Sequence, residues 1–299
     1  MSKQAITSRT RVLGVIGDPI EHSLSPLMHN YVLERLGLDY RYVAFHVQKD
    51  YGLHVGLAFR TLGLAGLNVT IPYKETVVGQ MDVLTEEARV VGAVNTIGLN
   101  AKGELVGHNT DVAGFLGALE IHVGECEPAG RGAVVLGAGG AARAVLYALG
   151  LSGARPIYLA NRTQSRAEAL AGWFSYILPD TQVELVPLTD MEALNKAFDN
   201  ALITVNVTPL GMAPKVDASP LPEGAQPKPG SLVFDTIYNP ERTLLLTQAQ
   251  EAGCRAIGGL DMLIIQGMVS LAWWLKKPIP WKEMMDGIRK LLLAELKKG

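Results

Sequence analysis

A short apolar run that ends in closely spaced small residues is the feature that most constrains the fold of this chain. Ala133-Val134-Val135-Leu136 has the composition of a strand buried on both faces, as in a parallel sheet. Gly137, Gly139 and Ala142 follow in the pattern G-x-G-x-x-A and lead into a helix predicted over 141–149. The segment therefore predicts a strand, a tight turn and a helix of a doubly wound parallel sheet.

The segment 112–258 repeats this alternation of helices and strands, which predicts a Rossmann-like domain. Its other helices are predicted over 113–123, 164–174 and 191–198, and its other strands over 157–160, 183–186, 202–207 and 232–235. The segment 209–230 contains six prolines and is predicted to be an irregular loop.

Residues 1–111 are predicted to form a second α/β domain, with a sheet whose strands run in mixed directions. Ser25 is the predicted N-cap of its first helix, with Pro26 at the first helical position and Gly37 just beyond the end. A further helix is predicted over 51–62, and strands are predicted over 12–16, 40–47, 67–71, 93–99 and 104–108. Two apolar helices, 260–276 and 281–297, are expected to pack back on this domain. The predicted domains are therefore 1–111 with 259–299, and 112–258.

Composition argues against nucleic-acid and membrane partners. The chain has 299 residues, 48% hydrophobic content and a formal net charge of −2, so it can bury a core but has no basic field. Its most apolar run, 262–275, is shorter than the roughly 20 residues that span a bilayer. Gln266 and Ser270 interrupt this run, which we expect to form a buried helix.

Cysteine usage predicts a cytoplasmic protein. Cys126 and Cys254 are the only cysteines, too few for a disulfide framework. The polar segment 1–10 lacks the apolar stretch of a secretory signal. The histidines do not have the spacing of metal ligands, so no metal site is predicted.

The glycine-rich turn predicts a site for the pyrophosphate of a dinucleotide. Its backbone and the free N–H groups of the following helix would lie close to an anion. The candidate cofactor residues here are Gly137, Ala138, Gly139, Gly140 and Ala141. The alternative is that these residues form only a tight strand–helix turn.

The next strand ends in Asn161-Arg162-Thr163, where NAD sites usually carry an acidic residue for the ribose. Arg162 instead suits the 2′-phosphate of NADP. Thr163 is the predicted N-cap of the next helix, which puts Arg166 in the first turn, where a cation opposes the helix dipole. A bound phosphate would remove that conflict, so NADP is preferred over NAD. The alternative is that both arginines are merely solvated.

Lys74 and Asp111 are the candidate proton-transfer pair. Lys74 follows an apolar strand and Pro72, at a carboxyl end where open α/β sheets bind ligands. Asp111 ends the run His108-Asn109-Thr110-Asp111. A lysine and an aspartate that meet can pass a proton to and from a substrate oxygen. The alternatives are a solvated lysine and an aspartate that caps a helix beginning at Val112.

Neutral polar side chains near the predicted strand ends suit a ligand with several hydroxyl groups. They are Asn68, Thr70, Asn95 and Asn109. Ser23 and Ser25 precede a helix N-terminus, which favours a carboxylate, although Ser25 could instead cap the helix. Gln266 must bond to the backbone or to a ligand, because burying an amide without partners costs roughly 1–3 kcal/mol.

Taken in order, these motifs resemble those of the shikimate dehydrogenase family over nearly the whole chain. GDPIEHSLSP (17–26) resembles the family's N-terminal substrate motif, and NVTIPYK (68–74), GAVNT (92–96) and NTD (109–111) resemble its central motifs. The glycine turn and Asn161-Arg162-Thr163 resemble its NADP elements. GLDML (259–263) with Gln266 resembles its C-terminal signature.

The resemblance implies a split substrate domain beside a Rossmann-like domain, and NADPH-dependent, reversible reduction of 3-dehydroshikimate to shikimate in aromatic amino acid biosynthesis. Lys74 would donate the proton, paired with Asp111, as hydride reaches the carbonyl carbon. Gly259 and Met262 would lie near the nicotinamide. The substrate contacts that the resemblance implies are Ser23, Ser25, Asn68, Thr70, Asn95, Asp111, Tyr238 and Gln266.

Two alternatives stay open from the sequence. A quinate/shikimate dehydrogenase would differ in pocket shape, although the serine at position 25 favours shikimate. A catalytically idle NADP-binding regulator on the same fold is disfavoured by the presence of both Lys74 and Asp111. We expect a monomer or homodimer without a fused dehydratase domain. The segment 206–212 matches a variable family segment, so its cofactor contacts are open.

Overall fold

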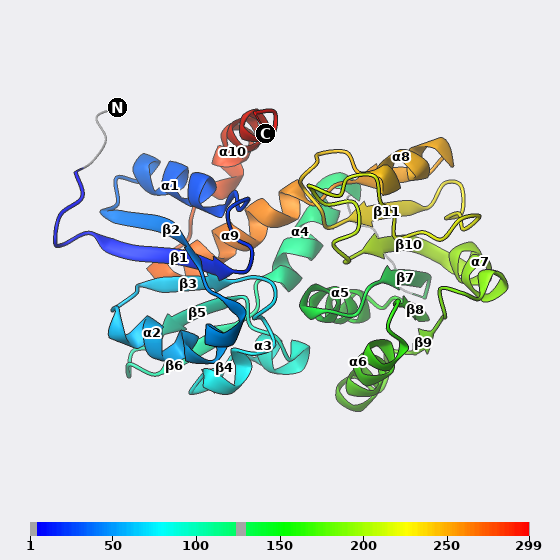
Figure 1. Ribbon diagram of the computed structural model, residues 1–299, viewed down its shortest axis with the longest axis horizontal. Helices are drawn as coiled ribbons and strands as arrows, with labels where there is room; N and C mark the ends of the chain where they lie inside the picture. The colour runs from blue at the N-terminus through cyan, green and yellow to red at the C-terminus, as the bar shows by residue number, and fades with distance from the viewer. Residues whose placement is uncertain (1–4, 124–129, 299) are drawn as a thin grey trace. The chain divides into compact units, whose positions relative to one another are not determined.

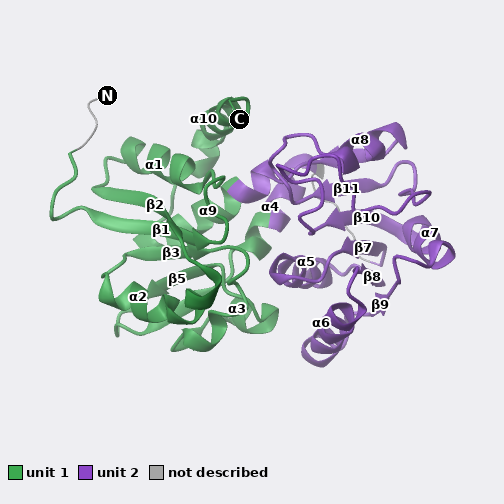
Figure 2. Cartoon of the chain, viewed as in Figure 1, with its two compact units in different colours: residues 1–114, 264–299 green, residues 115–263 purple. Residues whose placement is uncertain are grey.

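The computed structural model describes residues 5–123 and 130–298. It contains two compact units: unit 1, formed by Met1–Gly114 and Ile264–Gly299, and unit 2, formed by Phe115–Leu263 (Figure 2). The chain passes from one unit to the other within two helices, α4 (Asp111–Val123) and α9 (Leu260–Leu275). Cys126 lies outside the described residues.

Unit 1 is built on a six-stranded sheet with the order β2-β1-β3-β5-β6-β4 (Figure 1). β1 is parallel to β2 and β3, whereas β5 is antiparallel to β3 and β6, so the predicted mixed sheet is confirmed. The strands are β1 Arg11–Gly17, β2 Tyr40–His46, β3 Gly66–Val69, β4 Val83–Leu84, β5 Thr96–Leu99 and β6 Leu105–His108. The helices are α1 Ser25–Arg35, α2 Val55–Thr61, α3 Glu86–Val91 and α10 Trp281–Leu296, which packs against α1, with 3₁₀ turns at Lys49–His54 and Val78–Gln80.

Unit 2 contains a parallel sheet with the order β12-β11-β10-β7-β8-β9, which confirms the predicted doubly wound sheet. The strand order reverses between β7 and β10, the position where such sheets bind ligands beyond their carboxyl ends. The strands are β7 Gly132–Leu136, β8 Ile157–Ala160, β9 Val183–Leu185, β10 Ala201–Asn206, β11 Leu232–Asp235 and β12 Arg255–Ile257. The helices are α5 Gly140–Leu151, α6 Gln164–Ile177, α7 Met191–Asn200 and α8 Leu244–Glu251, besides the parts of α4 and α9 in this unit.

The first helix begins at Ser25, so the prediction of Ser25 as its N-cap is wrong by one residue. Leu24 is the N-cap, and its side chain makes no capping hydrogen bond. The hydroxyl that accepts a backbone N–H at the start of this helix is that of Ser23, because its Oγ accepts the N–H of Ser25 at 3.3 Å. Helix α4 likewise begins at Asp111 rather than at Val112.

The helix predicted over 51–62 is split into a 3₁₀ turn and α2. Gln80 causes the split. Its Oε1 accepts the N–H of Gly56 at 2.8 Å, and its Nε2 donates to the carbonyl oxygen of Gly52 at 2.9 Å. These two backbone groups would bond to each other in a continuous α-helix. A distant side chain therefore interrupts a segment whose own residues favour a helix.

Two helices that the sequence prediction missed carry ordinary capping signals. Thr85 precedes α3 and accepts the N–H of Ala88 at 3.3 Å, and Gly92 ends the helix with φ 66°. Thr243 precedes α8 and accepts the N–H of Leu246 at 3.3 Å. The neighbouring strands β4 and β12 were also missed, because they are too short to show an alternating pattern.

The lack of a side chain at Gly66 lets α9 pack closely on β3. A Cβ there would lie 2.5 Å from the indole of Trp274, whose Nε1 donates to the carbonyl oxygen of Ile97 at 2.9 Å. We expect Gly66→Ala to lower the free energy of unfolding by about 1–3 kcal/mol in urea titrations, because the indole must shift. Gly79→Ala is the control, since a Cβ there would meet no atom within 4 Å. Equal losses in both variants would contradict this packing role.

Candidate functional site

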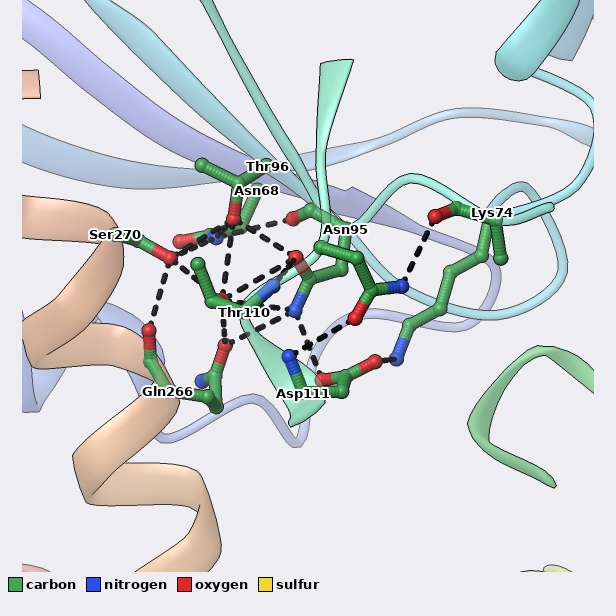
Figure 3. A network of polar contacts seen from close by, with 10 residues as sticks. Asn68, Lys74, Asn95, Thr96, Thr110, Asp111, Gln266 and Ser270 are labelled. Carbon is green, nitrogen blue, oxygen red and sulfur yellow. Dashed lines mark hydrogen bonds and ion pairs between the residues drawn. The ribbon is translucent and has the colours of Figure 1, made fainter. Parts of the chain in front are cut away.

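Lys74 and Asp111 form a close ion pair in unit 1 (Figure 3). The distance from Nζ of Lys74 to Oδ2 of Asp111 is 2.6 Å. Lys74 follows β3 and Asp111 follows β6, two strands whose carboxyl ends lie at the same edge of the sheet. The side chains are 14% and 7% exposed, so water screens the pair less than it would a surface pair.

Asn95 holds the carboxylate of Asp111 from its other side. Its Nδ2 donates to Oδ1 of Asp111 at 2.8 Å and to Oγ1 of Thr110 at 3.0 Å. Its Oδ1 accepts the N–H of Thr110 at 2.8 Å. The amide is thereby fixed, and the second carboxylate oxygen of Asp111 is directed toward Lys74.

Three buried hydroxyl groups, those of Thr96, Thr110 and Ser270, connect this pair to α9. Oγ of Ser270 lies 2.8 Å from Oγ1 of Thr96 and 3.0 Å from Oγ1 of Thr110. Ser270 also donates to the carbonyl oxygen of Gln266 at 2.9 Å. We term these three residues the hydroxyl cluster (Figure 3).

Asn68 lies behind the hydroxyl cluster and is engaged within the protein. Its Nδ2 faces the carbonyl oxygen of Asn95 and the hydroxyls of Thr96 and Ser270 at 3.0, 3.0 and 3.1 Å, three acceptors for two amide hydrogens. Its Oδ1 accepts the hydroxyl of Tyr42 at 2.7 Å. Burial raises the pKa of Tyr42 well above its usual value, so the phenol stays a donor.

The structure gives Gln266 partners that the sequence prediction did not consider. Its Oε1 accepts from Nδ2 of Asn95 and from Oγ1 of Thr110, each at 3.4 Å. The hydroxyl cluster was missed as part of the site. A signal existed for Ser270, because it and Gln266 interrupt an apolar helix four residues apart and therefore share a face.

Ser25 connects to the same region from α1. Its side chain is hydrogen-bonded to Tyr42, and its carbonyl oxygen lies 2.9 Å from Nδ1 of His29. His29 stacks on Tyr42 at 4.0 Å between ring centroids, and burial lowers the pKa of His29 to about 4, so the ring is neutral. Thr70 follows β3 and packs against Gly17. A Cβ on Gly17 would lie 2.6 Å from the methyl group of Thr70.

The predicted dinucleotide turn joins β7 to α5 in unit 2. Gly137 has φ 121°, a conformation open mainly to glycine, and a Cβ there would lie 2.9 Å from side-chain atoms of Val207 and Thr208. A Cβ on Gly139 would instead meet no atom within 4 Å. Helix α5 begins at Gly140 without a side-chain cap, while Ala138 and Ala141 are half-buried beside it.

The segment after β8 has the predicted backbone arrangement. Thr163 is the N-cap of α6, although its side chain makes no capping hydrogen bond. Nδ2 of Asn161 donates to the carbonyl oxygen of Thr163 at 2.8 Å. Arg162 and Arg166 are exposed, and Arg166 is in the first turn of α6.

The remaining candidates, Tyr238, Gly259 and Met262, lie in unit 2. Tyr238 is half-buried and burial raises the pKa of its phenol, whereas Met262 is buried. Gly259 touches the loop after β11 so closely that a Cβ would lie 2.1 Å from the carbonyl oxygen of Thr236. Only glycine fits that contact without moving backbone.

Two findings concern other classes of site. Among the described helices, none combines the length and the apolar character required to cross a membrane. Within residues 5–123 and 130–298, no group of three or more His, Cys, Asp or Glu side chains is placed to hold a metal ion.

Comparisons with known proteins agree over nearly the full length. Residues 15–97 match the shikimate dehydrogenase substrate binding domain, and residues 124–225 match the shikimate/quinate 5-dehydrogenase family. The NADP(+) shikimate dehydrogenase of Desulforamulus reducens is 41% identical over 98% of both chains. The chain belongs to the shikimate dehydrogenase family.

Solved structures of shikimate dehydrogenases have the same fold. The crystal structure of the Listeria monocytogenes enzyme in complex with shikimate and NAD has a TM-score of 0.85 at 35% identity, covering 97% of this chain and 98% of that one. A shikimate dehydrogenase in complex with NADP+ has a TM-score of 0.84 at 36% identity, covering 96% and 97%. Lys74 and Asn95 lie within the match to the substrate binding domain, whereas Asp111 lies between the two matched segments.

Proposed function

We propose that this protein is a shikimate dehydrogenase that reversibly reduces 3-dehydroshikimate to shikimate with NADPH, in aromatic amino acid biosynthesis. The observation that carries the proposal is the 2.6 Å ion pair between Lys74 and Asp111. The family relationship gives the substrate, and the pair supplies a proton donor of the kind that carbonyl reduction needs.

In the reducing direction, the ammonium of Lys74 donates a proton to the carbonyl oxygen of the substrate. Asp111 orients Lys74, and Asn95 prevents the carboxylate from rotating away. In the oxidising direction the neutral amine of Lys74 takes the hydroxyl proton back. Ser23 and Ser25 bind the substrate carboxylate, and Thr70, Asn95 and Gln266 line the ring. Tyr238 is a further proposed substrate contact. Asn68, whose amide hydrogens are engaged within the protein, contributes mainly by orienting these groups.

The residues of the glycine turn fit a dinucleotide. Neither a positive φ nor packing requires glycine at position 139, where a Cβ would meet open space, so its use there suits the close approach of a pyrophosphate. The uncapped N-terminus of α5 offers N–H groups to that anion, and Gly137, Ala138, Gly140 and Ala141 shape the turn. Asn161, Arg162, Thr163 and Arg166 would hold the adenosine ribose and its 2′-phosphate, and Gly259 and Met262 would lie near the nicotinamide. The bound cofactor supplies or accepts the hydride.

The proposal is tested by initial rates of nicotinamide reduction with shikimate and with quinate, each with NADP and with NAD. Rapid turnover of shikimate with NADP is the expected result. Faster oxidation of quinate would assign the quinate/shikimate alternative. Cofactor binding without turnover of either substrate would assign the idle regulator.

Arg162 is expected to decide the choice of cofactor. Arg162→Ala should raise KM for NADP at least ~10-fold, because a charge-assisted bond to the 2′-phosphate is lost, and leave KM for NAD nearly unchanged. Arg155→Ala removes the same charge at the opposite end of β8 and is the control. Equal use of NAD and NADP by the unsubstituted enzyme would remove this role from Arg162.

We further propose that the protein is cytoplasmic and is a monomer or a homodimer. Gel filtration with light scattering would distinguish the monomer from the homodimer.

A further inference from the structure

A buried polar pair joins the carboxyl ends of β10 and β11 in unit 2. Asn206 and Asp235 are opposite each other in the parallel register, and both are 0% exposed. Asn206 is also opposite Leu136, the residue before Gly137. The pair therefore lies directly beneath the edge of the sheet where the dinucleotide turn begins.

Asp235 fixes the loop that follows β11. Its Oδ1 accepts Nδ2 of Asn206 at 2.9 Å and the N–H of Ile237 at 3.1 Å. Its Oδ2 accepts the hydroxyl of Thr243 at 2.6 Å, and Thr243 caps α8. One carboxylate thus holds both ends of the segment 236–243, which contains Tyr238.

Asn206 fixes the loop that follows β10. Its Oδ1 accepts the N–H and the hydroxyl of Thr208 at 2.9 and 2.7 Å. Its carbonyl oxygen accepts the N–H and the hydroxyl of Thr236 at 3.0 and 2.9 Å. Thr208 lies against the first glycine of the dinucleotide turn, because a Cβ on Gly137 would come within 2.9 Å of its methyl group.

The loop after β11 also touches the start of α9. Gly259 donates its N–H to the carbonyl oxygen of Ile237 at 3.0 Å and presses against Thr236. Asp235 is therefore connected to Gly137 through Asn206 and Thr208, and to Gly259 through Ile237. Both glycines belong to the cofactor site of the proposed function.

We propose that Asp235 is a positioning residue for the dinucleotide, which sets the two loops against Gly137 and Gly259. This inference rests on the proposed function and deepens it. A buried carboxylate with only neutral donors is costly, and a neutral side chain of the same size could fill the space. What the carboxylate adds is two oxygens that both accept, with charge-assisted bonds that hold three donors in fixed directions.

Asp235→Asn is the decisive variant, because it keeps the size of the side chain and removes one acceptor and the charge. We expect the Kd for NADPH, from fluorescence titration, to rise at least ~10-fold. KM for shikimate should rise by a smaller factor, because the loop that Asp235 fixes contains Tyr238, and the melting temperature should not fall. Asp199→Asn, which removes an exposed carboxylate from the same unit, is the control and should leave all three unchanged.

Thr208→Val gives a second test that does not depend on the folding of the first variant. It keeps the methyl group against Gly137 and removes the hydroxyl bond to Asn206, so the Kd for NADPH should rise by a smaller factor. An unchanged Kd in either variant overturns the proposal, as does a Kd rise that comes only with a lower melting temperature. Assays of the unsubstituted enzyme separate the proposed function from the proposed role of Asp235. If that enzyme binds NADPH but does not oxidise shikimate, the result counts against the function alone.

Discussion

Replacing Lys74 by alanine is expected to lower kcat for shikimate oxidation at least ~10²-fold, the lower end for loss of a general acid or base. KM for shikimate should change little, because the serines, Thr70 and Asn95 of the proposed substrate site are untouched. The ammonium lies 2.6 Å from Asp111, and both side chains are largely buried. Steady-state kinetics with saturating NADP measure the effect.

The control for this experiment is Lys102→Ala, which removes an exposed lysine from the β5–β6 hairpin of the same unit. Lys74→Met, which fills the same volume without charge, should behave like the alanine variant. Near-normal kcat in both Lys74 variants would remove Lys74 from the chemistry. A large rise in KM with unchanged kcat would instead make Lys74 a binding residue.

The second large effect is on stability, where Asp235 is expected to make the folded protein less stable as the pH rises. Burial raises the pKa of Asp235 from 3.8 to about 6, against the bonds from Thr243, Ile237 and Asn206, which lower it. Between pH 4 and pH 6 the unfolded chain releases this proton while the folded chain keeps it. The contribution of Asp235 to the free energy of unfolding should therefore fall through this window, by ~3 kcal/mol in total, and stay constant at higher pH.

Other carboxyl groups have the opposite sign, so the measurement must be a difference. Backbone hydrogen bonds lower the pKa values of Glu21 and Asp82, and such groups make folding more favourable as the pH rises. Urea unfolding of the unsubstituted protein and of Asp235→Asn at pH 4 to 7 isolates the single group. The variant should gain relative stability as the pH rises toward 6, and a constant difference across the series would contradict the raised pKa.

The sequence predicted the elements of the site better than their connections. Lys74 and Asp111 could be paired in advance because each follows a strand and carboxyl ends gather at one edge. The register of the strands could not be predicted, so neither the contact between Asn206 and Asp235 nor its buried position was foreseen. Both residues nonetheless stand at or next to predicted strand ends.

The split helix and the missed hydroxyl cluster share a physical cause, which is competition from residues distant in the sequence. Gln80 takes the two backbone groups that would have closed the helix over 51–62. Ser270 reaches Thr96 and Thr110 across more than 150 positions, and no local propensity encodes such a meeting.

The hydroxyl cluster has a consequence for the hydrogen bonds behind Asn95 and Gln266. In each contact among Thr96, Thr110 and Ser270, either oxygen can be the donor. Each hydroxyl can reverse its polarity by a torsional swing of one hydrogen, with no heavy atom displaced. The polar network behind Asn95 and Gln266 can thus change its hydrogen-bond directions while every heavy atom stays in place.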